Sequence, residues 1–231
     1  MKKLINYFTL SERILLLSSI LLITASFLIF DGKGYLSFIA SLLGAVALIF
    51  CAKGNPIGQI IVIIFSMLYA YISYTFAYYG EMLTYLGMTA PMAIYAFITW
   101  IRNPYNGNHA EVKINRISKR ETVIMFILAI LVTALFYFLL KHFGTSNLLP
   151  STLSVTTSFI AVYLTARRSP LYAVAYGAND IVLIVLWLLA SLKDRGYVSV
   201  LMCFIVFLAN DIYGYINWHR MERSQAESCS Q

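Results

Sequence analysis

The sequence predicts an all-α integral membrane protein with about eight transmembrane helices, and three observations support this fold class. Hydrophobic residues make up 60% of the 231 residues and charged residues 12%, and the mean hydropathy of +0.76 lies far above that of soluble domains. The apolar residues form long runs, and a bilayer core about 30 Å thick needs about 20 apolar residues as helix. The basic residues fall mainly on one of the two sides that these runs define.

The apolar runs define the spans in order. The first run follows Lys2 and Lys3, but it is long and lacks an Ala-x-Ala cleavage pattern, so we expect an uncleaved span rather than a signal peptide. The sixth run is short and opens with the Ser/Thr-rich segment 151–158, so we expect its neighbours to bury it. Little room remains for a soluble domain, and residues 1–231 are expected to form a single membrane domain. The predicted spans are 12–30, 34–52, 57–79, 82–101, 121–141, 150–166, 170–192 and 196–218.

The positions of Lys and Arg test this topology independently, because cytoplasmic loops of membrane proteins are enriched in both. One side would hold Lys2, Lys3, Arg13, Lys53, Arg102, Lys113, Arg116, Lys119, Arg120, Arg167, Arg168, Arg220 and Arg223, and the other Lys33, Lys141, Lys193 and Arg195. Both termini are therefore expected in the cytoplasm. The net charge of +7 then follows from topology and from attraction to anionic lipid headgroups, so the lipid bilayer is the expected partner and nucleic acid is not.

An internal repeat organises the predicted bundle. The junction Lys53-Gly54-Asn55-Pro56 reappears as Arg167-Arg168-Ser169-Pro170 at an offset of 114 residues, and the helix ends Tyr95–Trp100 and Tyr213–Trp218 share a Tyr-x-aromatic-x-x-Trp pattern at an offset of 118. The repeat predicts a 1+3+1+3 arrangement. Its parts are an extra N-terminal helix 12–30, a first three-helix unit 34–103, a linker helix 121–141 and a second three-helix unit 147–220. One linker helix makes the two repeats parallel, and substrate is then expected near the middle of the membrane between them.

Polar residues inside the spans are the candidate substrate ligands, because a charged side chain in the bilayer is costly and is usually retained for function. Asp180 lies near the middle of the seventh span, with Asn179 beside it and Trp187 two helical turns away on the same face. Asn210 and Tyr213 lie on the eighth span, and Gln59 and Tyr69 on the third. Alternatively, Asn179, Asp180 and Asn210 form a hydrogen-bond clamp between the last two helices, and Tyr69 is packed in the core.

The aromatic residues Trp100, Trp218 and Tyr95 fall at or near predicted ends of spans, where Trp and Tyr commonly anchor a protein at the membrane interface. We therefore interpret them as interface anchors or gate residues.

The sequence offers little for catalysis or metal binding. Cys51, Cys203 and Cys229 show no CxxC spacing, and His109, His142 and His219 lie in loops or at span ends. We therefore expect no metal, no cofactor and no enzyme activity.

The runs 95–103, 179–187 and 210–218 together resemble the nicotinamide riboside transporter (PnuC) family over roughly residues 34–220. The resemblance implies a layout similar to that of the SWEET sugar transporters and a homotrimer in the bacterial inner membrane. It also implies vitamin uptake for NAD biosynthesis by facilitated diffusion, followed by phosphorylation by a cytosolic nucleoside kinase. Carried over by position, the substrate-binding residues are Asn179, Asp180, Trp187, Asn210 and Tyr213, with Gln59 and Tyr69 from the first half.

Several alternatives remain open. The same architecture also serves members of the family proposed to carry thiamine or riboflavin. A sugar carrier, a membrane receptor or scaffold, and a membrane-embedded enzyme are the other classes.

Overall fold

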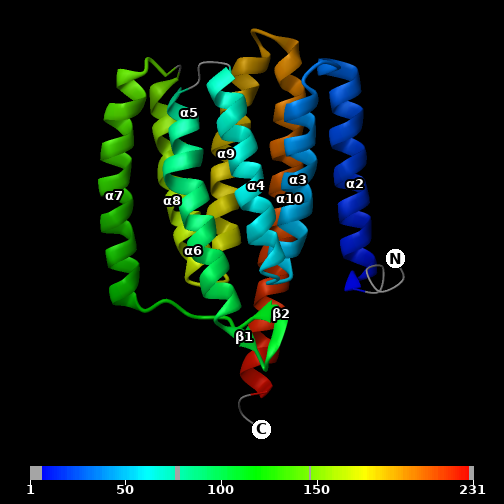
Figure 1. The fold of residues 1–231 in the computed structure, drawn as a ribbon, viewed down its shortest axis with the longest axis vertical. Coiled ribbons are helices and arrows are strands. Elements are labelled where there is room, and N and C mark those ends of the chain that lie inside the picture. Colours follow the sequence, from blue (N-terminus) through cyan, green and yellow to red (C-terminus); the bar gives the residue numbers. More distant parts are fainter. Residues whose placement is uncertain (1–6, 76–78, 146, 229–231) are drawn as a thin grey trace.

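The computed structural model describes residues 7–75, 79–145 and 147–228. Lys2, Lys3 and Cys229, which entered the sequence analysis, lie outside these ranges. Within the described chain, eight helices are long and apolar enough to cross a membrane, which confirms the predicted fold class. The helices stand side by side, and the start of the first and the end of the last lie at the same end of the bundle (Figure 1).

The first four spans follow the predicted order. Their bounds are Leu10–Ser26 (α2) with a π-helical continuation Phe27–Asp31 (η1), Tyr35–Ala52 (α3), Ile57–Thr75 (α4), and Tyr79–Thr84 (α5), Tyr85–Thr89 (η2) and Ala90–Ile101 (α6) as one span. The π-helical turn η2 directly precedes Pro91 near the start of α6. Since proline has no backbone N–H and its ring crowds the preceding turn, this widened turn is the local adjustment to Pro91.

A short hairpin precedes the last four spans. The bounds are Pro104–Tyr105 (β1), Asn108–Val112 (β2), Lys119–His142 (α7), Leu148–Ala166 (α8), Tyr172–Ser191 (α9), Arg195–Tyr197 (η3) and Val198–Ser228 (α10). Helix α10 runs ten residues past the predicted end of its span, and this extension contacts the segment after the hairpin. The Gln225 side-chain oxygen accepts a hydrogen bond from the Ile114 N–H (2.9 Å), and Arg116 pairs with Glu222 (2.6 Å).

Six helices close into a ring. In order of contact the ring runs α3, α4, α6, α8, α9, α10 and back to α3. Helices α2 and α7 pack outside it, α2 on α3 and α10, and α7 on α8, and they stand at opposite edges of the bundle (Figure 1).

The two junctions that share a sequence pattern also share a backbone conformation. Gly54 and Arg168 both have left-handed φ angles, of +65° and +59°. The segment at the end of the hairpin is bonded to both junctions, because the Val112 N–H donates to the Gly54 carbonyl (3.0 Å) and the Asn115 N–H donates to the Arg168 carbonyl (3.0 Å). We refer to residues 112–115 as the strap.

The two Trp residues of the repeated pattern form hydrogen bonds between neighbouring helices, from α10 to α3 and from α6 to α8. The Trp218 Nε1–H donates to the Cys51 carbonyl (2.9 Å) and the Trp100 Nε1–H to the Thr165 carbonyl (2.9 Å), so equivalent donors meet equivalent acceptors. Both rings are 0% exposed and their centroids lie 5.5 Å apart. This burial contradicts the predicted interfacial anchor role of Trp100 and Trp218, because a buried indole cannot reach lipid headgroups.

Candidate functional site

A cavity lies between the helices of the ring. Its volume, about 170 Å³, is roughly ten times what one water molecule needs. The lining residues come mainly from α3, α4, η2, α8, α9 and α10, with single residues from α5, α7 and the α7–α8 loop, and they include two carboxyl groups, Asp180 and Asp211. Among the described residues that line it there is no Lys, Arg or His, so the cavity carries acidic, amide, hydroxyl and aromatic groups but no basic one.

Asn179 is the most firmly held polar side chain of the cavity. Its Oδ1 accepts hydrogen bonds from the hydroxyls of Ser154 (3.1 Å), Thr157 (2.8 Å) and Ser158 (3.0 Å), all on α8. These bonds fix the amide plane and occupy its oxygen. The Nδ2 group, which donates to no side chain in the described chain, remains to bind a carbonyl or hydroxyl oxygen of a ligand.

Asp180 and Asp211 face each other from α9 and α10. Both are 4% exposed, and their carboxyl groups lie close enough to interact electrostatically. The Oδ2 atom of Asp180 is buried and has no partner within the described residues. Since buried polar atoms are almost always hydrogen-bonded, an unpartnered carboxyl oxygen on a residue that lines a cavity suits a ligand bound there.

Three more predicted residues line the same cavity from other sides. Gln59 on α4 is 3% exposed and donates from Nε2 to the Cys51 sulfur (3.4 Å). Tyr69 packs with ring centroids 4.7 Å from Phe65 and 5.1 Å from Tyr85. Trp187 is half-buried on α9 and adds a large π surface. The structure therefore brings Asn179, Asp180, Trp187, Gln59 and Tyr69 together.

Asn210, Tyr213 and Tyr95 do not line the cavity. Asn210 Nδ2 donates to Ser19 Oγ on α2 (3.0 Å) and to the Val206 carbonyl (2.8 Å), and the Tyr213 hydroxyl donates to Glu12 on α2 (2.9 Å). Both side chains point to the peripheral helix because α2 packs on that face of α10. Tyr95 is 49% exposed on α6.

The cavity is closed at the end of the bundle near the hairpin. Cys51, Thr165 and Tyr172 line it there, and the paired rings of Trp100 and Trp218 lie directly beyond them, with Tyr172 4.8 Å from Trp218. At the opposite end the lining reaches Thr145, in the loop between α7 and α8. The cavity thus extends from the paired rings of Trp100 and Trp218 toward the far end of the bundle.

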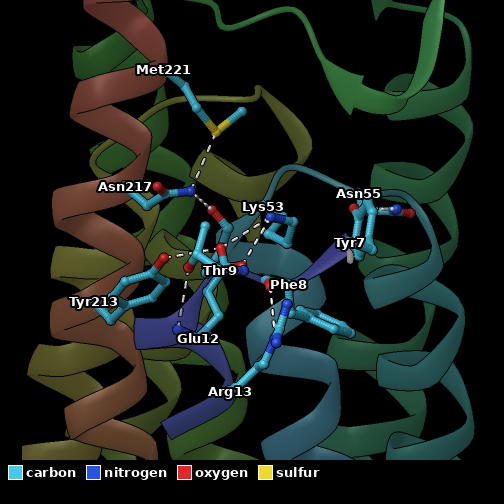
Figure 2. Close-up of polar contacts among 11 residues, drawn as sticks. Tyr7, Phe8, Thr9, Glu12, Arg13, Lys53, Asn55, Tyr213, Asn217 and Met221 are labelled. Atoms are coloured by element: carbon cyan, nitrogen blue, oxygen red, sulfur yellow. Dashed lines mark hydrogen bonds and ion pairs between the residues drawn. The ribbon is translucent and has the colours of Figure 1, made fainter. Parts of the chain in front are cut away.

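A second polar cluster lies outside the cavity, at the start of α2 (Figure 2). Glu12 is 1% exposed, and its carboxylate accepts from Lys53 Nζ (3.0 and 3.1 Å), from the Tyr213 hydroxyl and from the Thr9 N–H (2.7 Å). Lys53 also lies over the ring of Tyr7, 4.7 Å from its centroid. This cluster joins α2 to the junction after α3 and to α10.

A similar pair lies in the other half. Glu121, near the start of α7, pairs with Arg167, the residue equivalent to Lys53, and this hydrogen bond raises the pKa of the Arg167 guanidinium. Both acidic residues stand three positions after an N-cap hydroxyl, of Thr9 and Ser118, which accepts their backbone N–H.

Sequence reasoning missed two sets of residues. The hydroxyls of 154–158 were visible as a Ser/Thr-rich run, and their periodicity on one helix face was the available signal. Glu12 was visible only as the third residue of a capping pattern at Thr9, which predicts a helix start but not an ion pair with Lys53.

Comparison with known proteins identifies the family and the fold. The family model described as "Nicotinamide mononucleotide transporter" matches residues 34–220. The chain belongs to this family.

It is therefore a multi-pass membrane transporter, as the resemblance predicts, and the family is one of transporters rather than of enzymes. Two curated relatives are called nicotinamide riboside transporter PnuC. The one from Neisseria mucosa is 28% identical over 203 residues, 86% of this chain and 77% of the relative. The one from Haemophilus influenzae is 24% identical over 192 residues, 81% of this chain and 80% of the relative.

A solved structure is also similar. The crystal structure of the vitamin B3 transporter PnuC superposes with a TM-score of 0.81 at 26% identity, and the match covers 94% of each chain. The eight-span fold described above is therefore that of a transporter in this family.

Proposed function

We propose that this transporter carries nicotinamide riboside across the bacterial inner membrane by facilitated diffusion. The observation that carries the proposal is the lining of the cavity, which combines an oriented amide, two carboxyl groups and aromatic rings. No basic side chain is present among the described residues that line it. The names of the two curated relatives support the same substrate.

The ligand chemistry matches the lining group by group. Nicotinamide riboside is a pyridinium cation attached to a ribose, and aromatic faces attract such a ring by stacking and cation–π interaction. Asn179 and Gln59 offer amides for the carboxamide and ribose hydroxyls, and Trp187 and Tyr69 offer ring faces. A phosphorylated nucleotide would bring a dianion next to Asp180 and Asp211 without a compensating base, so the riboside is favoured over the mononucleotide.

Thiamine is the second candidate, and the same acidic lining supports it, because its thiazolium ring is also a cation. Riboflavin and sugars lack this charge. Isothermal titration of purified protein with nicotinamide riboside, nicotinamide mononucleotide, thiamine and riboflavin separates these candidates. Tight binding of the mononucleotide, or none of the riboside, would contradict the proposal.

We propose that transport occurs by rocking of the two three-helix units 34–103 and 147–220 about the cavity. The matched bonds of Trp100 and Trp218 and the matched junctions at Gly54 and Arg168 support a parallel 1+3+1+3 arrangement with a SWEET-like layout. In this proposal the buried Trp pair is the gate at the hairpin end.

The side of the membrane follows from the basic residues. Lys53, Arg167 and Arg168 lie at the two junctions that the strap bonds, and Lys113 and Arg116 lie in or next to the strap. We therefore assign this end and both termini to the cytoplasm, and the cavity then extends toward the outside. This arrangement suits uptake, with trapping inside by a cytosolic nucleoside kinase.

The energetic mechanism has a direct test. Asp180 and Asp211 are the acidic groups of the cavity, and no other group there is suited to couple an ion gradient. Uptake of labelled riboside into proteoliposomes is expected to persist, and to stop at equilibration, after the proton and sodium gradients are collapsed. Loss of uptake under these conditions would show a coupled transporter instead.

We also propose a homotrimer, from the family resemblance, with the outer helices available for contact between subunits. Size-exclusion chromatography of the detergent-solubilised protein, coupled to light scattering, measures the protein mass of the complex. A mass of three chains supports the homotrimer, and any other mass contradicts it.

A further inference from the structure

The acidic pair of the cavity has no positive partner in the protein. The ionisable side chains that interact electrostatically with Asp180 or Asp211 are Cys51, Tyr172, Tyr176 and Cys203. None of them can carry a positive charge. Within the described chain, the pair is therefore a buried acidic site without the cation that such sites normally contain.

Asp180 places this acidic site at the wall of the cavity. One of its oxygens is buried, unpartnered and part of a side chain that lines the cavity. The adjacent carboxyl group of Asp211 adds to the acidic character, and two carboxyl groups this close repel each other when both are ionised. A cation placed in the cavity relieves that repulsion and satisfies the free oxygen.

We infer that Asp180, supported by Asp211, is the counter-ion that makes this transporter select the positively charged, oxidised form of the nicotinamide nucleoside over the uncharged, reduced form. The inference rests on the proposed function. It goes beyond it because it assigns a redox-state specificity to one carboxylate. The attraction does not require contact with the ring, because charge interactions in a low-dielectric cavity extend over several ångströms.

The two redox forms make a matched pair of ligands. The 1,4-dihydronicotinamide riboside has the same ribose and carboxamide, and differs by a hydride that removes the ring charge. Hydrogen bonds to Asn179 and Gln59 are therefore available to both forms, and only the charge-dependent part of binding differs between them.

Isothermal titration of the purified full-length protein with both ligands tests the inference. The wild-type protein is expected to bind the oxidised riboside at least ten-fold more tightly than the reduced one. Asp180→Asn, which keeps the shape of the side chain, is expected to weaken binding of the oxidised form at least ten-fold and to change binding of the reduced form by less than two-fold. Asp194→Asn, in the loop before η3 and outside the cavity, is the charge-matched control. It is expected to retain the wild-type ratio of the affinities for the oxidised and reduced forms.

The outcomes separate the inference from the proposed function. Equal wild-type affinities for the two forms would overturn the counter-ion role and leave riboside transport intact. A preference that survives in Asp180→Asn would also overturn it, since Trp187 would then carry the selection by cation–π attraction. If the wild-type protein binds neither form, the proposed function itself fails.

Discussion

At the residue scale, the fixed amide of Asn179 is the feature of the cavity with the clearest consequence. Three hydroxyls from α8 converge on its carbonyl oxygen, which leaves the amide little rotational freedom. A ligand that accepts from Nδ2 therefore loses little affinity to ordering of this side chain.

Of the hydroxyls that hold Asn179, that of Thr157 does not line the cavity, so it is expected to affect binding without touching the ligand. Thr157→Val removes the shortest of the three bonds and is expected to weaken riboside binding about five-fold, since one net hydrogen bond is worth about 1 kcal/mol. Thr156→Val is the neighbouring control, because the Thr156 hydroxyl bonds Thr133 on α7 (2.8 Å) instead. Titration calorimetry of both variants makes the comparison, and equal losses would contradict the assigned role of Thr157.

The two junctions offer a matched test of backbone strain. Gly54 has φ +65°, and a Cβ there would lie 2.9 Å from Met221 Cε and 3.2 Å from Val112 Cγ1. Gly54→Ala is therefore expected to lower stability by about 1–2 kcal/mol, from left-handed strain and crowding. Arg168→Ala, at the equivalent position that already holds a Cβ, is expected to cost less. The melting temperatures of the two variants test this expectation. A smaller decrease in melting temperature for Gly54→Ala than for Arg168→Ala would contradict the role of backbone strain at Gly54.

Helical periodicity explains which site residues could be predicted from the sequence. Asp180 and Trp187 share a face of α9, and that face lines the cavity. On α10 the cavity-lining face holds Phe204, Phe207 and Asp211, whereas Asn210 is turned by one residue toward α2. Periodicity groups residues by face but does not say which neighbour each face meets, so the position of Asn210 required the packing of α2.

At the element scale, α2 is held to the ring by a buried ion pair rather than by apolar packing alone. Glu12 and Lys53 are 41 residues apart in sequence, and the carboxylate also receives the Tyr213 hydroxyl. A buried carboxylate that loses its partner is strongly destabilising, by about 3–5 kcal/mol.

A double-mutant cycle measures this pair. Lys53→Met leaves Glu12 buried without its cation and is expected to lower the melting temperature more than the double variant Glu12→Gln/Lys53→Met, which removes both charges. The same cycle on Glu121→Gln/Arg167→Met is the control in the other half, where the side chains are more exposed and the effect is expected to be smaller. Additive losses at Glu12 and Lys53 would rule out a coupled pair.

The spans themselves could be predicted because lipid-facing helices need long apolar runs. All eight predicted runs correspond to helices, including the short polar α8, whose hydroxyls are satisfied inside the bundle. The π-helical turn before Pro91 was beyond sequence reasoning, because the residue at which a helix adjusts to a proline depends on the neighbouring turns. The C-terminal end of α10 also differs from the predicted end of the span, because the extension of the helix is stabilised by partners distant in sequence such as Ile114.

At the scale of the whole molecule, the ring is closed at the hairpin end by two equivalent indole bonds across the contacts α10–α3 and α6–α8. Each is a buried hydrogen bond to a carbonyl at the end of a helix. If this end is the proposed gate, its opening requires at least one of these bonds to break, and the two bonds then set part of the barrier.

Replacing either indole is expected to loosen that end. Trp218→Phe keeps a ring but removes the donor to the Cys51 carbonyl, and the lost bond of about 1 kcal/mol is expected to raise the open fraction about five-fold. Cys51 lines the cavity and is buried, so its rate of labelling reports opening, with Cys203 and Cys229 replaced by Ser. An impermeant maleimide is expected to react faster with the variant in inside-out vesicles, and Tyr95→Phe is expected to match the wild type. An increase seen only in right-side-out vesicles would reverse the assigned topology.

The strap gives the bundle a mechanical asymmetry. Residues 112–115 bond the carbonyls of Gly54 and Arg168 at once. The two halves are therefore held at a fixed spacing at the hairpin end. At the far end no comparable tie joins the two halves among the described residues, and the connections there are loops between helices that are consecutive in the sequence. In the rocking motion proposed above, the two units would therefore separate widely at the far end of the bundle and shift only slightly at the paired Trp rings. With the proposed orientation, a large solute would enter through a broad opening on the outer side, and its release into the cytoplasm would depend on a slight displacement of the two Trp rings.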